Sequence, residues 1–221
     1  MRKSIEDELF ETSNYSLTSK RLLSEGCYIC EALNPLNKKV NIKLYVIPSI
    51  LKNKTIRDRA IREIKNGQKL KNCKWSISYF EHFYTKNLLV IVYENHQEFS
   101  LYKLKERFDK SNFIIILMTD LLEIITKLKN KQKFHSCITP NTLYLIKNKI
   151  KIGDIDHIYD QLETINKEII LDENYQFLSP EFYIRNKFLY PTVVFSLAAT
   201  TYFFIKGSLP FELDISTWGF K

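Results

Sequence analysis

The first half of the chain alternates apolar and polar positions, and this period of two predicts β-strands. From Tyr15 onward, segments rich in β-branched and aromatic residues are separated by short polar turns, one of which contains Asn34 and Pro35. The strands are expected at residues 22–26, 28–32, 40–46, 76–83 and 88–93. Residues 55–71 instead place apolar side chains, Ile61 among them, at helical spacing with charged residues between them. The pattern therefore predicts a five-stranded antiparallel sheet with one amphipathic helix.

The second half is dominated by helical patterns. Residues 112–129 are apolar nearly all round, and a helix of this kind is expected to be buried. A second apolar run starts at Pro191, reaches Ile205 and is ended by Gly207. Because a membrane span needs about 20 apolar residues, we expect a buried helix here and no membrane partner. A short helix is also expected at residues 100–108.

A polar loop and a small hairpin lie between these two helices. The loop, residues 134–145, holds His135, the thiol of Cys137 and two threonines, but no carboxylate. It leads into two short alternating strands, 143–146 and 149–152, with a turn between them. A loop between a helix and a hairpin is a suitable place for a reacting group, so this loop is the centre of the functional interpretation.

The chain is expected to divide into three parts. Residues 1–14 are charged, contain no apolar core of a signal peptide and are interpreted as a charged N-terminal leader. The polar segment 94–97 breaks the strand pattern and is interpreted as a hinge. It would separate an N-lobe at residues 15–96 from a C-lobe at residues 97–221.

Composition and charge narrow the class of protein. The chain has 221 residues with 45% hydrophobic content, which is enough for a folded core. Its formal net charge of +8 would suit an acidic partner such as nucleic acid. The lysines are spread along the chain without a block of five or six, however, so we expect a solvated surface and not a nucleic-acid-binding one.

The four cysteines indicate neither a zinc finger nor a disulfide framework. Cys27 and Cys30 form a CxxC pair without a second pair at zinc-finger spacing. In a strand these two side chains would point to opposite faces of the sheet. Reduced thiols are the default expectation, which favours an intracellular protein, cytoplasmic or nuclear.

Several short segments follow one another in a familiar order. They are Ser24-Glu25-Gly26-Cys27-Tyr28-Ile29, Val40-Asn41-Ile42-Lys43, Arg62-Glu63-Ile64, His135-Ser136-Cys137-Ile138-Thr139-Pro140-Asn141-Thr142, Asp154-Ile155-Asp156 and Ser179-Pro180-Glu181. In this order the chain resembles the eukaryotic protein kinases over residues 15–213. It looks most like the Ser/Thr kinases of the Polo-like, Aurora and calmodulin-dependent groups. The resemblance implies an α+β, two-lobed protein-kinase-like fold whose C-lobe is truncated after the helix at 191–205.

In the first half, the resemblance implies a partly retained ATP site. Gly26 is the one remaining glycine of the phosphate-covering loop. Lys43 corresponds to the lysine that contacts the nucleotide phosphates, and Glu63 corresponds to the glutamate that pairs with it. Glu94 and Asn95 would face the edge of the adenine.

Two further positions of the first half bear on the adenine pocket. The family has a small residue where this chain has Asn41, which would place a polar amide where adenine packs. Tyr93 corresponds to the gatekeeper position that precedes the hinge.

In the second half, the resemblance implies that most of the catalytic groups are lost. The catalytic aspartate has become Cys137, and a neutral thiol is a poor acceptor for the substrate hydroxyl. The phosphate-steadying lysine has become Thr139. Asp154 keeps the position of the main Mg²⁺ ligand. Thr142 occupies the position of the metal-binding asparagine, although a one-residue slip would give that role to Asn141.

The groups that regulate the family are also altered. Ser136 replaces the arginine that receives a phosphorylated activation loop, and Thr164 is the one hydroxyl besides tyrosines between residues 154 and 178. Val193 replaces an aspartate that holds the catalytic loop. The arginine partner of Glu181 would lie beyond Lys221.

These losses favour a pseudokinase that acts as a scaffold or allosteric regulator of another protein, such as an active kinase or a kinase substrate. The alternative is a weakly active, ATP- and Mg²⁺-dependent Ser/Thr protein kinase that uses Lys43, Glu63 and Asp154. A rival nucleophile formed by Cys137 and His135 lacks a third orienting group. A degenerating remnant with no retained function is also left open.

Overall fold

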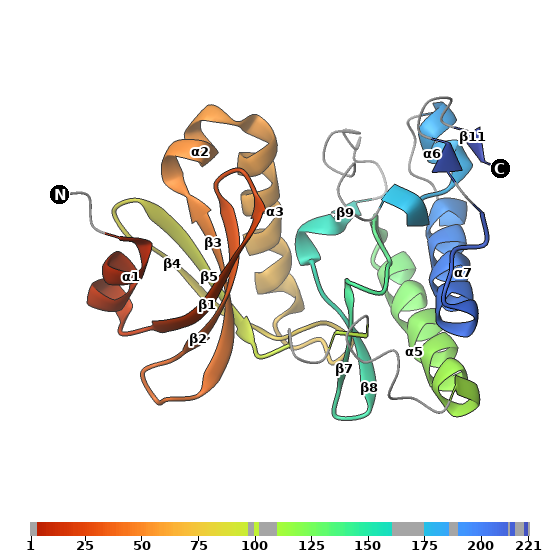
Figure 1. The fold of residues 1–221 in the computed structure, drawn as a ribbon, viewed down its shortest axis with the longest axis horizontal. Coiled ribbons are helices and arrows are strands. Elements are labelled where there is room, and N and C mark those ends of the chain that lie inside the picture. Colours follow the sequence, from red (N-terminus) through yellow and green to blue (C-terminus); the bar gives the residue numbers. More distant parts are fainter. Residues whose placement is uncertain are drawn as a thin grey trace. The chain divides into compact units, whose positions relative to one another are not determined.

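The computed structural model describes residues 4–96, 100–101, 110–160, 175–185, 190–211, 213–214 and 219–220. The chain divides into two units, Met1–Glu98 and Phe99–Lys221, which we call the N-terminal and C-terminal units. The N-terminal unit is built on a sheet and the C-terminal unit is mainly helical (Figure 1). The expected α+β class is therefore confirmed.

A five-stranded antiparallel sheet forms the N-terminal unit, as the alternation of apolar residues predicts, but its first strand begins at Ser16 rather than Leu22, and residues 25–26 form a turn. Its spatial order is β1-β2-β3-β5-β4, so that β1 and β4 are the edges. The strands are β1 (Ser16–Ser24), β2 (Cys27–Leu33), β3 (Lys39–Val46), β4 (Tyr79–Tyr84) and β5 (Leu88–Glu94). Strands β3 and β5 are buried along nearly their whole length, because both faces of the sheet are covered.

One face of the sheet is covered by α3 (Lys54–Leu70), which matches the helix predicted at 55–71. A short helix, α2 (Ile47–Lys52), precedes it, and Asn53 caps α3 by accepting from the backbone N–H groups of Thr55 and Ile56. Ile61 does not lie on the buried side as expected, since its side chain is 58% exposed. Glu63 takes a buried position on the helix instead.

The opposite face is covered by a helix that the sequence pattern did not reveal. Residues 5–13, within the expected leader, form α1 (Ile5–Ser13), which is capped by Ser4. Leu9 of α1 is fully buried in one apolar cluster with Ile42 and Val90 of the central strands. Figure 1 shows α1 and α3 on opposite sides of the sheet. The charged leader is thus corrected to a helix that completes the core of this unit.

Two helices frame the C-terminal unit. They are α5 (Lys110–Asn130) and α7 (Tyr190–Lys206), which are packed together through the rings of Phe113 and Phe204, 5.3 Å apart. The expectation that residues 112–129 are buried on all sides is wrong. Ile115 and Leu122 of α5 are 65% and 53% exposed, so one side of the helix is not covered. Among the described residues, no helix is long and apolar enough to cross a membrane.

The hairpin and the loop lie against α5. Strands β7 (Leu143–Ile146) and β8 (Lys149–Ile152) match the predicted hairpin. The two turn residues, Lys147 and Asn148, both have positive φ, which suits a tight hairpin turn. Asp120 of α5 holds the hairpin by accepting from the backbone N–H of Ile150 at 2.9 Å.

The remaining elements of this unit are short. They are β6 (Lys133–His135), η2 (Ile155–His157), β9 (Ile158–Asp160), η4 (Tyr175–Phe177), α6 (Pro180–Arg185), β10 (Leu213–Asp214) and β11 (Gly219–Phe220). Most of the helix expected at 100–108 lies outside the described residues, as do residues 161–174 with Thr164.

Candidate functional site

The predicted ion pair is present in the N-terminal unit. Nζ of Lys43 on β3 lies 3.2 Å from Oε2 of Glu63 on α3, and the side chains are 4% and 2% exposed. The hydroxyls of Tyr45 and Tyr93 both donate to the Glu63 carboxylate. A buried ion pair is stable only where further hydrogen bonds satisfy it, and the two tyrosines supply these bonds.

The sequence contained a signal for one of these tyrosines. Lys43 and Tyr45 are two positions apart on β3 and therefore share a face of the sheet. Tyr93 lies on the neighbouring strand β5, opposite Asn41. Its bond to Glu63 depends on the sheet register and was not expected.

Asn41 is bonded to the backbone that follows β5. Its side chain is fully buried, and Oδ1 accepts from the backbone N–H of His96 at 2.6 Å. Its amide nitrogen lies 3.4 Å from the carbonyl oxygen of Cys30 and donates to it. Nδ1 of His96 donates to the carbonyl oxygen of Glu94 at 2.7 Å. The backbone edge that the resemblance assigns to adenine is therefore bonded within the chain.

The expected positions Glu94 and Asn95 lie in this same segment. The Glu94 carboxylate accepts from the backbone N–H of Ser78 at 2.6 Å, which holds the end of β5 against the residues before β4. His96 was not singled out from the sequence. Its role depends on a side-chain oxygen 55 positions earlier, which no local pattern reveals.

Gly26 forms the turn between β1 and β2. Its φ is +71°, and a Cβ at this position would lie 2.2 Å from the hydroxyl oxygen of Ser49 on α2. Both observations explain a glycine here by local packing. The turn is also tied to the end of β3, because the backbone N–H of Val46 donates to the Gly26 carbonyl at 2.8 Å.

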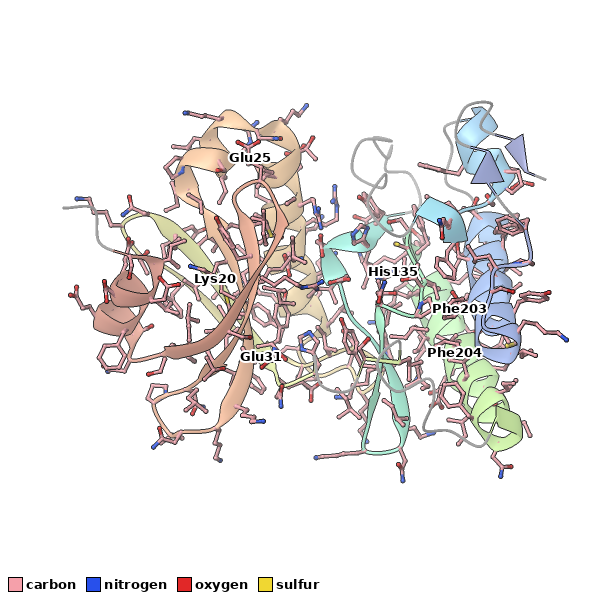
Figure 2. The ribbon with its side chains drawn as sticks, in the orientation of Figure 1. Lys20, Glu25, Glu31, His135, Phe203 and Phe204 are labelled. Atoms are coloured by element: carbon pink, nitrogen blue, oxygen red, sulfur yellow. The ribbon has the colours of Figure 1, made fainter. Side chains whose placement is uncertain are left out.

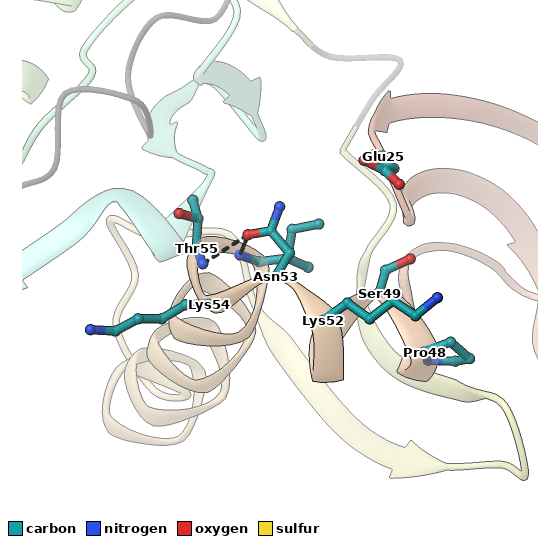
Figure 3. A pocket seen from close by; sticks show the side chains of 8 residues that line it. Glu25, Pro48, Ser49, Lys52, Asn53, Lys54 and Thr55 are labelled. Atoms are coloured by element: carbon teal, nitrogen blue, oxygen red, sulfur yellow. Dashed lines mark hydrogen bonds between the residues drawn. The ribbon is translucent and has the colours of Figure 1, made fainter.

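A polar pocket of about 470 Å³ lies next to this turn, at the start of α3. Figure 3 shows Asn53 at its centre with its bond to Thr55. The lining residues are Glu25, Pro48, Ser49, Lys52, Asn53, Lys54, Thr55 and Ile56. None of the predicted site residues is among them.

In the C-terminal unit, His135 lies at the end of β6, where the loop begins (Figure 2), and its burial favours the neutral ring. It is fully buried, and burial lowers its pKa to about 4. Its Nε2 donates to the carbonyl oxygen of Gly153 at 3.0 Å, and its Nδ1 accepts from the backbone N–H of Cys137 at 3.2 Å. Both ring nitrogens are engaged, so the ring is not placed to take a proton from the Cys137 thiol.

Cys137, which the resemblance aligns with the catalytic aspartate of the kinases, is 1% exposed. The loop around it is closed by Thr142, whose hydroxyl lies 2.9 Å from the Cys137 carbonyl and 3.1 Å from that of Thr139. The same oxygen accepts from the backbone N–H of Thr139 at 3.0 Å. These bonds give Thr142 a structural role within the loop.

Two of the positions expected to hold Mg²⁺, Thr142 and Asp154, lie close along the backbone, because the N–H of Gly153 donates to the Thr142 carbonyl at 2.8 Å. The Thr142 side chain is buried and bonded inside the loop, whereas Asn141 beside it is exposed. Asp154 is partly buried, with φ at +44°. Among the described residues, no three His, Cys, Asp or Glu side chains are grouped so as to hold a metal ion.

Ser136 and His157 connect the loop to the segment after Asp154. The Ser136 hydroxyl lies 3.2 Å from Nδ1 of His157, and the Ser136 backbone N–H donates to the His157 carbonyl at 2.9 Å. Oδ2 of Asp156 lies 3.9 Å from Nε2 of the same histidine. The contact between Ser136 and His157 was not visible in the sequence, where the resemblance aligns Ser136 with a phosphate-binding arginine.

The loop is also attached to α7. Val193, which the resemblance aligns with an anchoring aspartate, is buried and apolar. Thr200 on the same helix donates to the carbonyl oxygen of Ile138 at 2.9 Å. A different residue of α7 thus holds the loop backbone.

A comparison of the chain with protein-family models finds no match, and a comparison with curated proteins finds none either. The kinase resemblance therefore stays a prediction. Any function assigned to this chain depends on the bonds observed within each of its two units.

Proposed function

We propose that the chain is a pseudokinase: a two-lobed, protein-kinase-like domain that binds a protein and does not phosphorylate it. The observation that carries the proposal is the state of the loop 135–142. It contains no carboxylate, and the side chain at the catalytic position is the buried thiol of Cys137. A thiol that is excluded from solvent is a poor acceptor for the proton of a substrate hydroxyl.

The kinase-like frame is supported by the ion pair. The resemblance pairs Lys43 with Glu63, which lies 20 positions later in the chain. In the fold, Nζ of Lys43 on β3 is 3.2 Å from Oε2 of Glu63 on α3. The five-stranded antiparallel sheet and the mainly helical second unit are compatible with the same frame.

The loss of chemistry is supported by several substitutions together. A positioned general base contributes about 10²–10⁴-fold to a rate. Here the base and the phosphate-steadying lysine are replaced by Cys137 and Thr139, and both side chains are buried. Because the two substitutions each slow phosphoryl transfer, their effects on the rate would multiply.

Binding of a protein partner is the function that remains for a stable scaffold without this chemistry. An active kinase or a kinase substrate would be such a partner. The four cysteines form no disulfide, which supports an intracellular setting, cytoplasmic or nuclear. This part of the proposal rests on analogy with the kinase frame.

The second candidate is a weakly active, ATP- and Mg²⁺-dependent Ser/Thr kinase. The intact Lys43–Glu63 pair favours it, because this pair positions the phosphates in kinases. Asp154 would be the metal ligand, with Asn141 or Thr142 beside it in sequence.

One experiment separates the two candidates. The full chain is incubated with radiolabelled ATP, Mg²⁺ or Mn²⁺ and a generic protein substrate, beside the Lys43→Met and Asp154→Asn variants. A pseudokinase transfers no more phosphate than either variant. Transfer that both variants abolish would establish the weak kinase instead.

The proposed binding of a protein partner needs a separate measurement. The full chain is crosslinked in cells, and any crosslinked protein is then tested for direct, stoichiometric binding to the purified chain. We expect binding that does not depend on ATP. The absence of any direct partner would favour a remnant without retained function.

A further inference from the structure

We propose that the Asn41 carboxamide is a built-in occupant of the position that a nucleobase would take against residues 94–96. The inference rests on the kinase-like frame of the proposed function and concerns the regulation of that same site. It is drawn from contacts inside the N-terminal unit alone. The ligand class that Asn41 replaces is a planar heteroaromatic ring with a hydrogen-bond acceptor beside a donor, such as adenine.

The His96 backbone N–H already has an acceptor. It donates to Oδ1 of Asn41 at 2.6 Å, and both residues are nearly excluded from solvent. A buried N–H that loses its acceptor carries the full cost of being desolvated. A ligand would therefore have to offer an equivalent acceptor in place of Asn41.

The Glu94 carbonyl, two residues earlier, is engaged as well. It accepts from Nδ1 of His96 at 2.7 Å. Two backbone groups of the segment, the Glu94 carbonyl and the His96 N–H, are thus each met by a side chain of the protein. Adenine carries an acceptor nitrogen next to an amino donor on one edge, and it would need these same two backbone groups.

The sheet register brings Asn41 to this backbone. Residue 41 lies on β3 directly opposite Tyr93, and Val40 lies opposite Glu94. The amide nitrogen of Asn41 is held by the Cys30 carbonyl on β2. Contacts on both sides of the side chain fix the amide, so it does not swing freely.

Two functional consequences follow. The His96 N–H and the Glu94 carbonyl take their partners from side chains of the protein, so a nucleobase would have to displace both of these bonds. Removal of the Asn41 carboxamide should allow a nucleobase to bind at this edge. The change leaves the His96 N–H without its acceptor and empties the space that the amide fills.

The test uses adenosine as the probe, since it lacks phosphates and is independent of Mg²⁺ and of Lys43. Binding to the purified full chain is followed by thermal shift and by the NMR signal of the His96 amide. The variants are Asn41→Ala and Asn41→Ala/His96→Ala, the second of which also releases the Glu94 carbonyl. Asn53→Ala is the matched control, because it too removes an amide that accepts backbone N–H groups.

The wild type should show no saturable response to millimolar adenosine. Asn41→Ala should bind it at least about tenfold more tightly, which corresponds to one recovered hydrogen bond, and the double variant should bind more tightly still. Asn53→Ala should lower the melting temperature without gaining binding. Equal binding by wild type and Asn41→Ala, or no gain in a folded Asn41→Ala, overturns the proposal.

A second measurement keeps the proposal testable if the variants do not fold. In the wild type, the His96 amide should exchange slowly with solvent, and adenosine should leave its chemical shift unchanged. An adenosine-dependent shift at His96 overturns the inference. Neither result involves phosphoryl transfer or a protein partner, so failure here leaves the proposed function to be judged by its own assays.

Discussion

Lys43 and Glu63 form an ion pair that is almost entirely removed from water, with 3.2 Å between Nζ and Oε2. The pair joins β3 to α3, and the hydroxyls of Tyr45 and Tyr93 complete the bonding of the carboxylate. The Glu63 carboxylate thus joins α3 to the sheet, beside the buried side chains of Ile56, Ala60 and Leu70 on the same helix. A movement of α3 away from the sheet would have to break these bonds together.

The first prediction concerns the charge pair. Lys43→Met leaves Glu63 as a buried charge without its cation, and it should lower the free energy of unfolding by about 3–5 kcal/mol. The double variant Lys43→Met/Glu63→Leu should be more stable than Lys43→Met alone, because no buried charge remains. Urea unfolding of the four members of this cycle measures both effects. A double variant as unstable as the sum of the single changes would contradict the buried-charge explanation.

The second prediction concerns the two tyrosines. Tyr45→Phe and Tyr93→Phe each remove one hydroxyl that donates to a charged carboxylate, and each should cost about 1.5–3 kcal/mol of unfolding free energy. Tyr84→Phe is the matched control, because its side chain is 61% exposed and should change stability by less than about 0.5 kcal/mol. Chemical denaturation compares the three. Costs equal to that of Tyr84→Phe would show that the hydroxyls do not support Glu63.

The third prediction tests α1 as part of the core. Leu9 is fully buried among side chains of the central strands, so Leu9→Ala should cost about 2–5 kcal/mol. Phe10 next to it is 53% exposed, and Phe10→Ala should have a small effect. Thermal unfolding of the two variants gives the comparison. If both changes were equally mild, residues 5–13 would be a dispensable leader after all.

The fourth prediction is a pH dependence of stability that arises from His135. Its pKa falls from 6.5 to about 4 in the fold because burial disfavours the charged ring. Between pH 6.5 and about 4, the unfolded chain therefore binds one more proton than the folded chain does. Above pH 6.5 the ring is neutral in both states, and the folded state has its full stability. As the pH falls from 6.5 toward 4, the free energy of unfolding should decrease by roughly 3 kcal/mol.

Urea unfolding at a series of pH values tests this expectation. His135→Gln should be less stable at neutral pH but should show a shallower fall between pH 6.5 and 4. NMR titration of the ring gives the folded pKa directly. A ring that titrates near 6.5 in the folded chain would contradict the prediction.

The fifth prediction concerns Gly67 on α3. A Cβ at this position would lie 2.4 Å from a ring carbon of Tyr79, whose side chain is 4% exposed. Alanine would gain about 1 kcal/mol of helix propensity, but overpacking costs typically about 1–3 kcal/mol. Gly67→Ala should therefore destabilise the fold, whereas Lys69→Ala on the exposed side of the helix should be neutral. Differential scanning calorimetry distinguishes a lower melting temperature from the rise that propensity alone predicts.

The sequence pattern was most informative where the signal is local. The alternation over residues 40–46 placed β3 within one residue of its observed start, and the hairpin of β7 and β8 has its predicted bounds. The pairing of Lys43 with Glu63 was predicted from the resemblance and is present. The pattern was least informative for Ile61 and for α5, because helical spacing does not say which side a neighbouring element will cover.

What the sequence by itself determined about this protein is the order of the five sheet strands, α3, α5, the β7–β8 hairpin and α7, since the side-chain period of each of these elements is set by its own residues. Only the tertiary structure decided that Leu9 closes the second face of the sheet, that Ser136 meets His157, and that Asn41 accepts from the His96 backbone. The two hydrogen-bonded pairs join residues 21 and 55 positions apart. Such partners depend on strand register and on the packing of distant elements, which local periodicity does not encode.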